Sequence, residues 1–483
     1  MVLKIYFPQW VNPFNILIFF LWQSTIFFGV QNIFSIFTHY IPNWRCKNIG
    51  DYGNNCTIFT SGCEIEYENE YFASVPIKFE LVCNNNSYFN AFQSQFQFFG
   101  VLLGTVAFGY LSDKYGRRSS SIVNMGLGCL TIIISAFVND SETYVSTRFF
   151  LGFFTGGALN SSLTYASEVL PPKQRLFVKC CFNWGLSRLI MTLICYFFND
   201  YTSALFISGI ILLPSVFLLI FYFPESPTWY HYKNKVELLV KSERKIAKLS
   251  HLPYRPSSNL IIPNKVSFLT LLQDKTIFKR LSALWCIWFI TSLCSYAIDL
   301  NSNTISGNLY INQFFFGFTI FISKLIVPYI DTKYKWFTRR SFHQGAQIVV
   351  VLCFAMLALL VSVKHDSVAI LILNLIGIVF IEFCWDACYL SSIESMPTNV
   401  RCSSFASCSL MARVGAIFSP VLPLLNNYWS PTMYLIVAGL GIVNFIVSYF
   451  FLIETKNINL DNVFVDEAFQ TEMDTFTELL DTK

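Results

Sequence analysis

Twelve apolar runs, each about as long as a bilayer is thick, constrain this chain more than any other feature. They fall near residues 14–37, 92–112, 120–138, 144–166, 178–198, 203–223, 282–299, 308–330, 345–363, 367–390, 403–425 and 431–452. Lipid offers the backbone no hydrogen-bonding partner, so runs of this length cross it as helices. Only 13% of the residues are charged, about half the share found in soluble domains. The sequence therefore predicts an all-α membrane protein with twelve transmembrane helices.

Basic residues collect in the loops on one side of the predicted bundle. The turn after the second run carries Lys114, Arg117 and Arg118, and the loop at 224–281 has eleven Lys or Arg against four acids. By the positive-inside rule, this side is cytoplasmic. The even number of spans then puts both termini in the cytoplasm. No small-residue cleavage site follows the first run, which we interpret as a retained span.

The largest loop on the opposite side, at 38–91, has the features of an extracellular segment. It carries five glutamates and two N-glycosylation sequons, at Asn55 and Asn85. Its four cysteines are Cys46, Cys56, Cys63 and Cys83. They could form two disulfides in any of three pairings, which agrees with an oxidising compartment.

Sequence landmarks recur after six runs. The pattern Glu-x-x-Pro-x-x-x-Arg follows the fourth run from Glu168 to Arg175 and the tenth run from Glu394 to Arg401, 226 positions later. Glu225 after the sixth run is matched by Glu454 after the twelfth. The chain is therefore predicted to form two pseudo-symmetric six-helix bundles.

These landmarks divide the chain into four parts. They are an N-terminal bundle at 1–223, a cytoplasmic linker at 224–281, a C-terminal bundle at 282–453 and an acidic cytoplasmic tail at 454–483. The linker contains a basic stretch from Val236 to Leu249 that we expect to be an amphipathic helix.

The charged turn from Asp113 to Arg118, preceded by Gly109, resembles the signature loop of the major facilitator superfamily. Arg148-x-x-x-Gly152-x-x-x-Gly156-Gly157 resembles the second motif of that superfamily, and its glycines are expected to permit close helix packing. The large outer loop together with the segment 224–229 (Pro-Glu-Ser-Pro-Thr-Trp) is similar to the organic ion transporters, which comprise organic cation, organic anion and carnitine carriers. The resemblance implies a secondary transporter with the major facilitator fold.

Three further positions resemble the organic anion branch. They are Arg413 in the eleventh run, Lys324 in the eighth, and Asn32 near the end of the first. The resemblance implies that they belong to a site for organic anions. Carnitine carriers also have an arginine at the position of Arg413, so a zwitterionic substrate stays open.

Lys324 and Arg413 carry positive charge at mid-membrane depth. A cation there costs roughly 2.5–3.5 kcal/mol on insertion scales, so each needs an aqueous cavity or a counter-charge. In a cavity, a carboxylate about 4 Å away gains on the order of 4 kcal/mol at an effective dielectric near 20. The alternative is structural ion pairing with Glu382 and Asp386, which lie one helical turn apart in the tenth run. These two acids also keep organic cations, zwitterions and proton coupling open.

Aromatic residues are so abundant, with 51 Phe, 24 Tyr and 10 Trp, that most are expected to pack against lipid or neighbouring helices. The family resemblance singles out Tyr296, Trp385 and Tyr389 as a wall for organic substrates. The predicted substrate site therefore comprises Lys324, Arg413, Tyr296, Trp385, Tyr389, Asn32, Glu382 and Asp386.

Charged residues at the inner helix ends form a second predicted site, a gating network that breaks when the carrier opens inward. Its members are Asp113, Arg117, Arg118, Arg148, Glu168, Arg175, Glu225, Glu394, Arg401 and Glu454. Asp113 is expected to pair with Arg117 or Arg118, or to accept hydrogen bonds from a helix N-terminus, and so to lock the halves together. Glu168 with Arg175, and Glu394 with Arg401, are expected to make similar contacts. The role of Arg188 in the fifth run stays open.

The sequence contains no phosphate-binding glycine loop, and its five His lack metal-ligand spacing. We therefore expect no enzymatic activity, cofactor, metal site or nucleic-acid partner. The predicted protein is a plasma-membrane carrier, surrounded by lipid, that moves small organic anions by alternating access. The family resemblance implies exchange against an internal dicarboxylate or facilitated diffusion. The alternatives are a carrier of organic cations or carnitine-like zwitterions, and a non-transporting receptor or scaffold.

Overall fold

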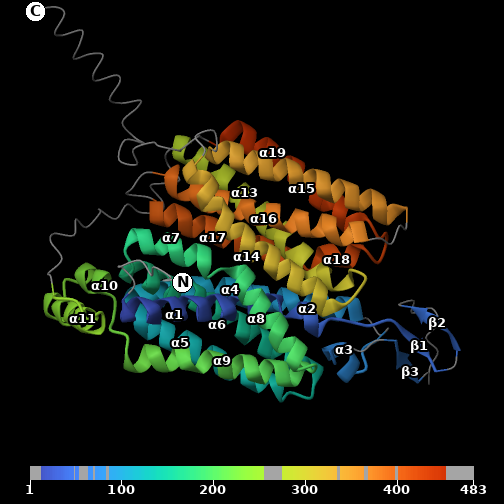
Figure 1. Ribbon diagram of the computed structural model, residues 1–483, viewed down its shortest axis with the longest axis horizontal. Coiled ribbons are helices and arrows are strands. Elements are labelled where there is room, and N and C mark those ends of the chain that lie inside the picture. The colour runs from blue at the N-terminus through green and yellow to red at the C-terminus, as the bar shows by residue number, and fades with distance from the viewer. Residues whose placement is uncertain are drawn as a thin grey trace, which may run out of the picture.

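In the computed structural model, the described residues are 12–47, 49–53, 64–68, 71–82, 86–254, 275–333, 338–363, 368–396 and 401–452. Within them, long helices run side by side along the length of the molecule (Figure 1). The linker helices α10 (Pro227–Tyr232) and α11 (Val236–Leu249) lie at one end, here called the inner end. A small β-sheet lies at the opposite, outer end (Figure 1).

Each half of the chain supplies six spanning segments, some of them interrupted. The first half comprises α1 (Pro13–Val30), η1 (Gln31–Ile33), α2 (Ser35–Thr38), α4 (Asn86–Tyr115), α5 (Arg117–Ala136), α6 (Ser141–Val169), α7 (Pro172–Cys181), α8 (Trp184–Phe197) and α9 (Tyr201–Phe221). The second half comprises α13 (Lys275–Asn301), η3 (Ser302–Thr304), α14 (Leu309–Lys333), α15 (Arg339–Ser362), α16 (Val368–Glu394), α17 (Arg401–Phe418), α18 (Val421–Leu425) and α19 (Thr432–Phe451).

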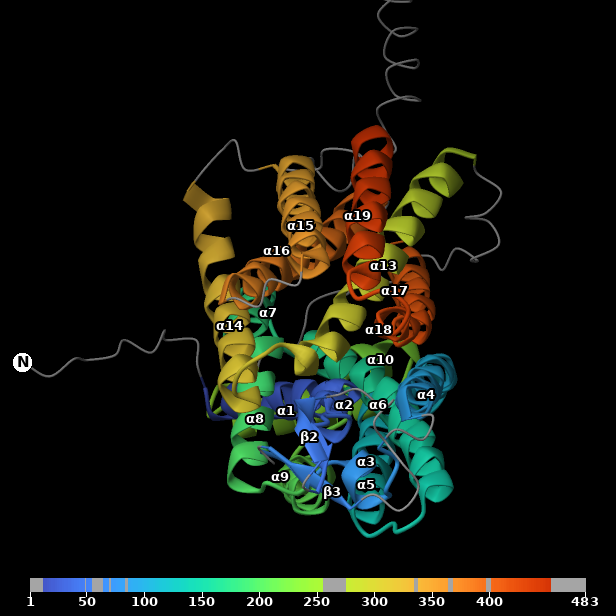
Figure 2. The same ribbon diagram turned by 90° about the vertical axis from the view of Figure 1, so that its right-hand side faces the viewer.

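Each half has a hydrophobic core of its own, although Tyr310 of the second half packs into the core of the first. Phe28 and Met125 belong to a buried cluster of the first half, and Phe354 and Val437 belong to one of the second half. Viewed from the outer end, the two groups of helices lie one above the other (Figure 2). The predicted fold class, twelve transmembrane helices in two six-helix bundles, is confirmed.

Eleven segments of the described chain are long and apolar enough to cross a membrane. The twelfth, α6, has 29 residues but is rich in glycine and hydroxyl side chains. It packs closely on α4: a Cβ at Gly104 would lie 1.9 Å from the carbonyl oxygen of Phe153, and one at Gly152 would lie 2.0 Å from that of Gln97. Glycines on both helices thus let the two backbones touch, and the packing role predicted for the α6 glycines is confirmed.

The fifth span is broken between α7 and α8 by Asn183. Its Oδ1 accepts a hydrogen bond from the Leu186 backbone N–H at 3.1 Å, and its Nδ2 donates to the Cys180 carbonyl at 2.8 Å. An asparagine at this N-cap position stabilises a helix start by about 1 kcal/mol. The break leaves α7 as a separate segment that lies beside α14 of the other half, and α7 carries Lys179.

The two halves meet most closely where α8 packs on α14. A Cβ at Gly185 would lie 2.4 Å from the backbone nitrogen of Phe321, and one at Gly317 would lie 3.0 Å from the Leu189 side chain. A second seam runs between α4 and α17. Sliding or rocking of one half against the other must therefore occur along these two pairs of helices.

The outer loop contains a small antiparallel sheet that the all-helical expectation missed. β1 (Trp44–Cys46) pairs with β2 (Ile49–Gly53) on one side and with β3 (Ile65–Tyr67) on the other. Arg45 pairs with Glu66 at 2.8 Å across β1 and β3, so part of the acidity of this loop is locally neutralised. Strands of three to five residues are too short to give a readable alternation of polar and apolar residues.

Two boundaries differ from the sequence prediction. α13 already begins at Lys275, so the predicted linker at 224–281 includes its first turns, whereas the linker helix at Val236–Leu249 is confirmed as α11. Cys46 is buried in β1. The other candidate disulfide cysteines and both sequon asparagines, Cys56, Cys63, Cys83, Asn55 and Asn85, lie outside the described residues. Their pairing and modification stay predictions.

Candidate functional site

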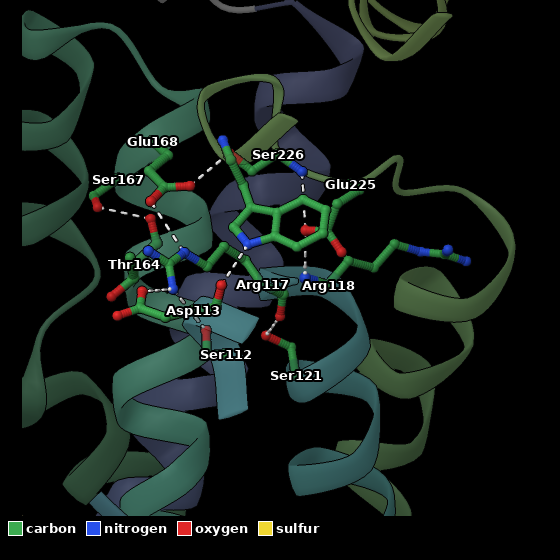
Figure 3. A network of polar contacts seen from close by, with 11 residues as sticks. Ser112, Asp113, Arg117, Arg118, Ser121, Thr164, Ser167, Glu168, Glu225 and Ser226 are labelled. Carbon is green, nitrogen blue, oxygen red and sulfur yellow. Dashed lines mark hydrogen bonds and ion pairs between the residues drawn. The ribbon is translucent and has the colours of Figure 1, made fainter. Parts of the chain in front are cut away.

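The inner ends of α4, α5 and α6 are joined by a charge network centred on Arg117 (Figure 3). Its guanidinium pairs with Asp113 at 2.5 Å and with Glu168 at 3.2 Å, and it donates to the hydroxyl of Ser112 at 3.1 Å. The other oxygen of the Glu168 carboxylate accepts from the Ser226 hydroxyl. The network therefore ties three helices to the start of the linker.

Glu225, rather than Asp113, caps the N-terminus of α5. Its carboxylate accepts from the backbone N–H groups of Arg118 at 2.8 Å, Ser119 at 3.4 Å and Ser226 at 3.0 Å. Burial raises the pKa of the Glu225 carboxyl, while these N–H groups act in the opposite direction. Gly116 makes room for it, since a Cβ there would lie 2.3 Å from a Glu225 oxygen and the residue has φ +113°.

The second half repeats the arrangement. Arg339, at the start of α15, pairs with Glu394 at 3.1 Å, as Arg117 pairs with Glu168. Arg340 donates to the Tyr449 carbonyl on α19, just as Arg118 donates to two carbonyls at the end of α9. The repeat predicted from sequence spacing is therefore a repeat of contacts, in which Arg339 holds Glu394.

Other predicted members of the network lie elsewhere. Arg148 is in the outer part of α6, about 30 Å along the helix from Glu168, and its guanidinium donates to the Tyr144 hydroxyl. The Nε of Arg175 donates to the Leu170 carbonyl at 2.7 Å. The Arg401 side chain and Glu454 lie outside the described part of the chain.

The predicted lock between the halves takes a different form. Among the described residues, each inner ion pair joins groups of the same half: Asp113 and Glu168 hold Arg117, and Glu394 holds Arg339. The reason is that each of these arginines begins a helix that packs beside the helix bearing its glutamate, so the short contact is within a half. The inner network thus fixes the shape of each half.

Substitution Asp113→Asn is expected to leave surface expression intact and to slow transport about fivefold, because it removes an exposed pair worth about 1 kcal/mol while Glu168 still holds Arg117. Uptake per surface molecule, from counts of labelled protein at the cell surface, measures this. Glu64→Gln, which removes the exposed pair with Lys47 at the outer end, is the matched control and should transport normally. Unchanged turnover in Asp113→Asn would contradict the gating role.

At mid-membrane depth, Lys324 on α14 is held by both acids of α16. Its Nζ lies 3.0 Å from Glu382 and 2.8 Å from Asp386, and it also donates to the Glu382 carbonyl at 3.0 Å. The expectation of a free cation at this position is therefore wrong, and the structural pairing given as the alternative is what the structure contains. The cause is geometric: residues at i and i+4 of one helix present both carboxylates to the same neighbour.

Arg413 on α17 differs from Lys324, because it makes no ion pair among the described residues. Its side chain is half-buried, its Nε has no hydrogen-bond partner there, and it interacts with Tyr296 of α13. Tyr389 of α16 also lies within its electrostatic reach. Arg413 is thus a cation without a described counter-charge at the depth where the sequence predicted a substrate contact.

Lys179 is the residue that sequence reasoning missed. It comes from α7 of the first half, its side chain is exposed, and its Nζ lies 4.5 Å from the centroid of the Tyr389 ring in the second half. Like Arg413, it makes no ion pair among the described residues. A cation–π contact of this kind contributes about 0.5–2 kcal/mol. The signal available was a lysine just inside the fifth apolar run.

The predicted aromatic residues are partly brought together. Trp385 and Tyr389 lie 6.0 Å apart between ring centroids, and both contact Trp288, which is buried and donates to Ser392 at 2.7 Å. Trp288 is therefore the support of this wall. Asn32 is separate: it is buried on η1, where its Oδ1 accepts from Gln97 at 3.2 Å.

Near the outer end, a buried ion pair joins the halves. Arg188 of α8 pairs with Asp299 of α13 at 2.5 Å, with side-chain exposures of 0% and 4%. The same guanidinium donates to Gln313 at 2.7 Å and to Ser302 at 3.4 Å. The role left open for Arg188 is thus a contact between the halves.

Tyr310, at the outer start of α14, makes a second contact between the halves. Its ring stacks on Phe37 at 6.2 Å and meets Tyr196 edge-on at 5.5 Å, and its hydroxyl donates to the Tyr71 carbonyl. All three partners belong to the first half. Together with the buried ion pair, this aromatic socket holds the outer ends of α8, α13 and α14 closed.

Two repeated six-helix halves, a mid-membrane set of charges between them and contacts that close one end define an integral multi-pass membrane transporter of the major facilitator type, not an enzyme. The family described as sugar (and other) transporter matches residues 62–466. The chain belongs to this family.

Curated relatives include solute carriers and an organic cation/carnitine transporter. An uncharacterized protein of Caenorhabditis elegans is 33% identical over 93% of this chain and 94% of its own length. Human solute carrier family 22 member 13 is 25% identical over 80% and 70%, and organic cation/carnitine transporter 4 of Arabidopsis thaliana is 26% identical over 87% and 82%. The relatives place the chain among the solute carrier family 22 type of secondary transporters.

Solved structures support the fold alone. The inward-open xylose transporter of E. coli is 16% identical and covers 93% of this chain and 98% of its own, with a TM-score of 0.62. A proton:xylose symporter bound to 6-bromo-6-deoxy-D-glucose covers 94% and 98% at 17% identity, with a TM-score of 0.65.

Proposed function

We propose that this transporter moves small organic anions by alternating access, with Arg413 and Lys179 as the groups that bind the anionic end. The observation that carries the proposal is that two basic side chains, one from each half, meet around Tyr389 without an acidic partner among the described residues. Arginine supplies a planar fork for a carboxylate or sulfate, and lysine supplies a point charge.

The charges at this depth support an anionic substrate. The described set contains three basic side chains, Lys179, Lys324 and Arg413, and two acidic ones, Glu382 and Asp386, so one positive charge is in excess. Both acids are committed to Lys324. An arriving anion neutralises the excess and gains on the order of 4 kcal/mol from a cation about 4 Å away at an effective dielectric near 20.

The arrangement also suits alternating access. Lys179 belongs to the first half and Arg413 to the second, so an anion bridging them couples the two halves. The outer ends are held together by Arg188–Asp299 and Tyr310, while the exposed Lys179 is open to water. An anion released from between the two cations leaves two like charges facing each other, which favours separation of the halves.

A carnitine-like zwitterion or an organic cation is the second candidate. Lys324 is only 11% exposed, yet Glu382 and Asp386 each keep a partly accessible carboxylate, and an ammonium group could replace the Lys324 contact. One relative is named an organic cation/carnitine transporter. A zwitterion would then place its carboxylate at Arg413 and its ammonium at the two acids.

The remaining parts of the proposal concern the cellular setting. We place the protein in the plasma membrane with both termini cytoplasmic, the cysteine-containing loop outside and Asn55 and Asn85 glycosylated. Exchange against an internal dicarboxylate would supply the driving force. The basic linker and the acidic outer loop support this orientation.

Uptake of three labelled compounds in cells making the protein tests the proposal: an aryl carboxylate such as benzoate, tetraethylammonium and carnitine. We expect saturable uptake of the carboxylate and none of tetraethylammonium, and internal dicarboxylate should accelerate it. Uptake of carnitine alone would favour the zwitterion reading. Uptake of tetraethylammonium alone, or of no compound by correctly localised protein, would overturn the proposal.

A further inference from the structure

The linker helix α11 is held to the first half by one of its sides. Ser242 donates a hydrogen bond to the Glu225 carbonyl at 2.5 Å, and Ile246 and Leu249 pack against the hydrophobic core of the first half. Figure 1 shows α10 and α11 at the inner end of the molecule. The opposite side of α11 faces away from these contacts, and its side chains are exposed.

This exposed side combines a positive centre with apolar ends. The linker patch, as we name it, consists of Arg244, Lys245, Lys248, Val236, Leu238 and Leu252. Its three basic side chains make no ion pair among the described residues, and Val236 and Leu252 are 67% and 57% exposed. Lys241 is set apart, because Glu237 one turn before it offsets its charge. A surface of this composition attracts a partner that is both acidic and apolar.

The chain itself carries a segment of complementary composition. Residues 453–483 lie outside the described part of the chain, and their sequence has eight acidic residues against two Lys. Apolar residues recur in it at helical spacing, at Val465, Phe469, Met473, Phe476 and Leu480. On a helix, the flanks and the opposite side of this stripe carry Asp466, Glu467, Asp474, Glu478 and Asp481, and Glu472 interrupts the stripe. The spacing therefore predicts an acidic amphipathic helix over 465–480.

The acidic segment starts at the same end of the molecule as the linker patch. α19 ends at Phe451, whose ring centroid lies 5.4 Å from the Nζ of Lys279 near the start of α13. The twelve residues between Leu452 and Val465 span at most about 40 Å when extended, which is about four helix diameters. The segment can therefore reach from the second half to the linker patch on the first half.

We propose that the linker patch is a docking surface for the acidic segment 465–480 of the same chain. The apolar stripe of the segment packs on Val236, Leu238 and Leu252, while its acidic sides face the basic centre of the patch. The two helices match in length, at about 24 Å for the segment and about 21 Å for α11. Because the segment is tethered, its effective concentration at the patch is on the order of millimolar, so a weak contact suffices.

Docking joins the two halves at the inner end. The segment continues from α19 of the second half, whereas α11 is fixed to the first half. Among the described residues, the inner ion pairs Arg117–Glu168 and Arg339–Glu394 each stay within one half. A flexible tether brings its ends together less often as their separation grows, so docking is strongest when the inner ends are close. By linkage, the docked segment restrains inward opening and lowers the maximal transport rate.

Carbodiimide coupling, which joins a lysine directly to a carboxylate in contact with it, tests the docking. The sample is the full-length protein in nanodiscs of neutral lipid, with one copy per disc. We expect mass spectrometry to find Lys245 and Lys248 joined to acidic residues of the segment 465–480. Lys114, an exposed lysine at the inner end of α4, is the matched control and should be joined to the segment at least tenfold less often. Equal coupling of all three lysines, or no coupling of Lys245 and Lys248, would overturn the proposal.

Two tail variants of unchanged charge separate docking from general attraction. Phe469→Ser combined with Phe476→Ser removes the middle of the apolar stripe, so coupling at Lys245 and Lys248 should fall at least tenfold. Phe464→Ser changes a residue off the stripe and should leave the coupling as it is. Size-exclusion profiles verify folding. Coupling that survives the double variant would need charge alone, and the docking surface would have to be given up.

An anionic membrane surface is the competing occupant of the linker patch. Acetylation rates of Lys245 and Lys248 measure how well the patch is covered. In neutral discs, we expect both lysines to react at least fivefold more slowly in the full chain than in a chain that ends at Leu460. Protection that appears only in discs containing phosphatidylserine, and equally without the segment, would assign the patch to lipid and overturn the proposal.

The chain that ends at Leu460 also tests the restraint on transport. Its maximal rate of carboxylate uptake, per molecule at the cell surface, should be at least twofold above that of the full chain. An equal rate would show that docking does not restrain inward opening. This measurement rests on the proposed function, whereas the coupling and acetylation experiments need no substrate, so a failure of the proposed function and a failure of the docking are distinguished.

Discussion

Replacing Arg413 with alanine is expected to abolish uptake of an aryl carboxylate while the protein still reaches the cell surface. The guanidinium has no described ion pair to lose, so its removal relieves a buried charge and does not destabilise the fold. What is lost is the attraction for the substrate, on the order of 4 kcal/mol, or roughly a thousandfold in affinity. Initial uptake rates normalised to surface protein measure the effect.

Three companion variants sharpen this test. Arg413→Lys keeps the charge but loses the planar fork, so it should retain part of the uptake at a raised KM. Lys179→Ala should raise KM less than Arg413→Ala, because a lysine offers an anion a point charge whereas the arginine fork makes paired hydrogen bonds to a carboxylate. Lys241→Ala, on the exposed face of α11, is the matched control and should behave as the wild type. Preserved carboxylate uptake in Arg413→Ala would remove this arginine from the site.

The sequence predicted that both Lys324 and Arg413 lack a counter-charge, whereas Lys324 is paired with two acids and only Arg413 of the two makes no ion pair among the described residues. Lys324 and Arg413 look alike in the sequence, as single basic residues in apolar runs. Only the relative rotation of α14 and α16 decides that both acids of α16 face Lys324. Lys179 was not predicted as a site residue because a lysine at the edge of an apolar run ordinarily extends its charged end to the membrane surface. The break at Asn183 places it between the halves instead.

The fold was more predictable than the site, because each span can be recognised from its length and its apolar composition. Spacing even predicted the repeat, which the structure extends to matched contacts of Arg117 with Glu168 and Arg339 with Glu394. No sequence pattern indicated the contacts between the halves. Arg188 and Asp299 lie 111 positions apart, and nothing in the sequence relates them. Pairing across an interface depends on helix packing, which periodicity does not report.

Substitution Asp299→Asn is expected to be among the most damaging changes in the chain. It leaves the fully buried guanidinium of Arg188 with neutral partners only, Gln313 and Ser302. Removing one member of a buried pair commonly costs about 3–5 kcal/mol, because an uncompensated charge stays behind. The closed outer end should therefore open or the protein should lose stability, and uptake should fall at least tenfold. A melting curve of the purified protein reports the loss of stability.

Labelling of Cys195 measures the opening of the outer end directly. It is fully buried in α8, close to Tyr310, and a membrane-impermeant maleimide should label it faster in Asp299→Asn than in the wild type. Cys195→Ala in the same background identifies the signal, since labelling at other cysteines would persist. Glu66→Gln, which breaks the partly exposed outer pair with Arg45, is the control and should change neither labelling nor melting.

The double variant Arg188→Met with Asp299→Leu separates a charge effect from a packing effect. Removing both charges leaves no uncompensated ion, and replacing a buried pair by apolar side chains is often neutral or stabilising. The double variant should therefore melt near the wild-type temperature, whereas Asp299→Asn alone should not. Its outer end should open less readily, because the introduced methionine and leucine would make an apolar contact between α8 and α13 that opening exposes to water, so transport should be slow even though the protein is stable. A double variant as unstable as Asp299→Asn would show that Arg188 and Asp299 serve local packing, and their part in closing the outer end would have to be given to Tyr310 and its socket.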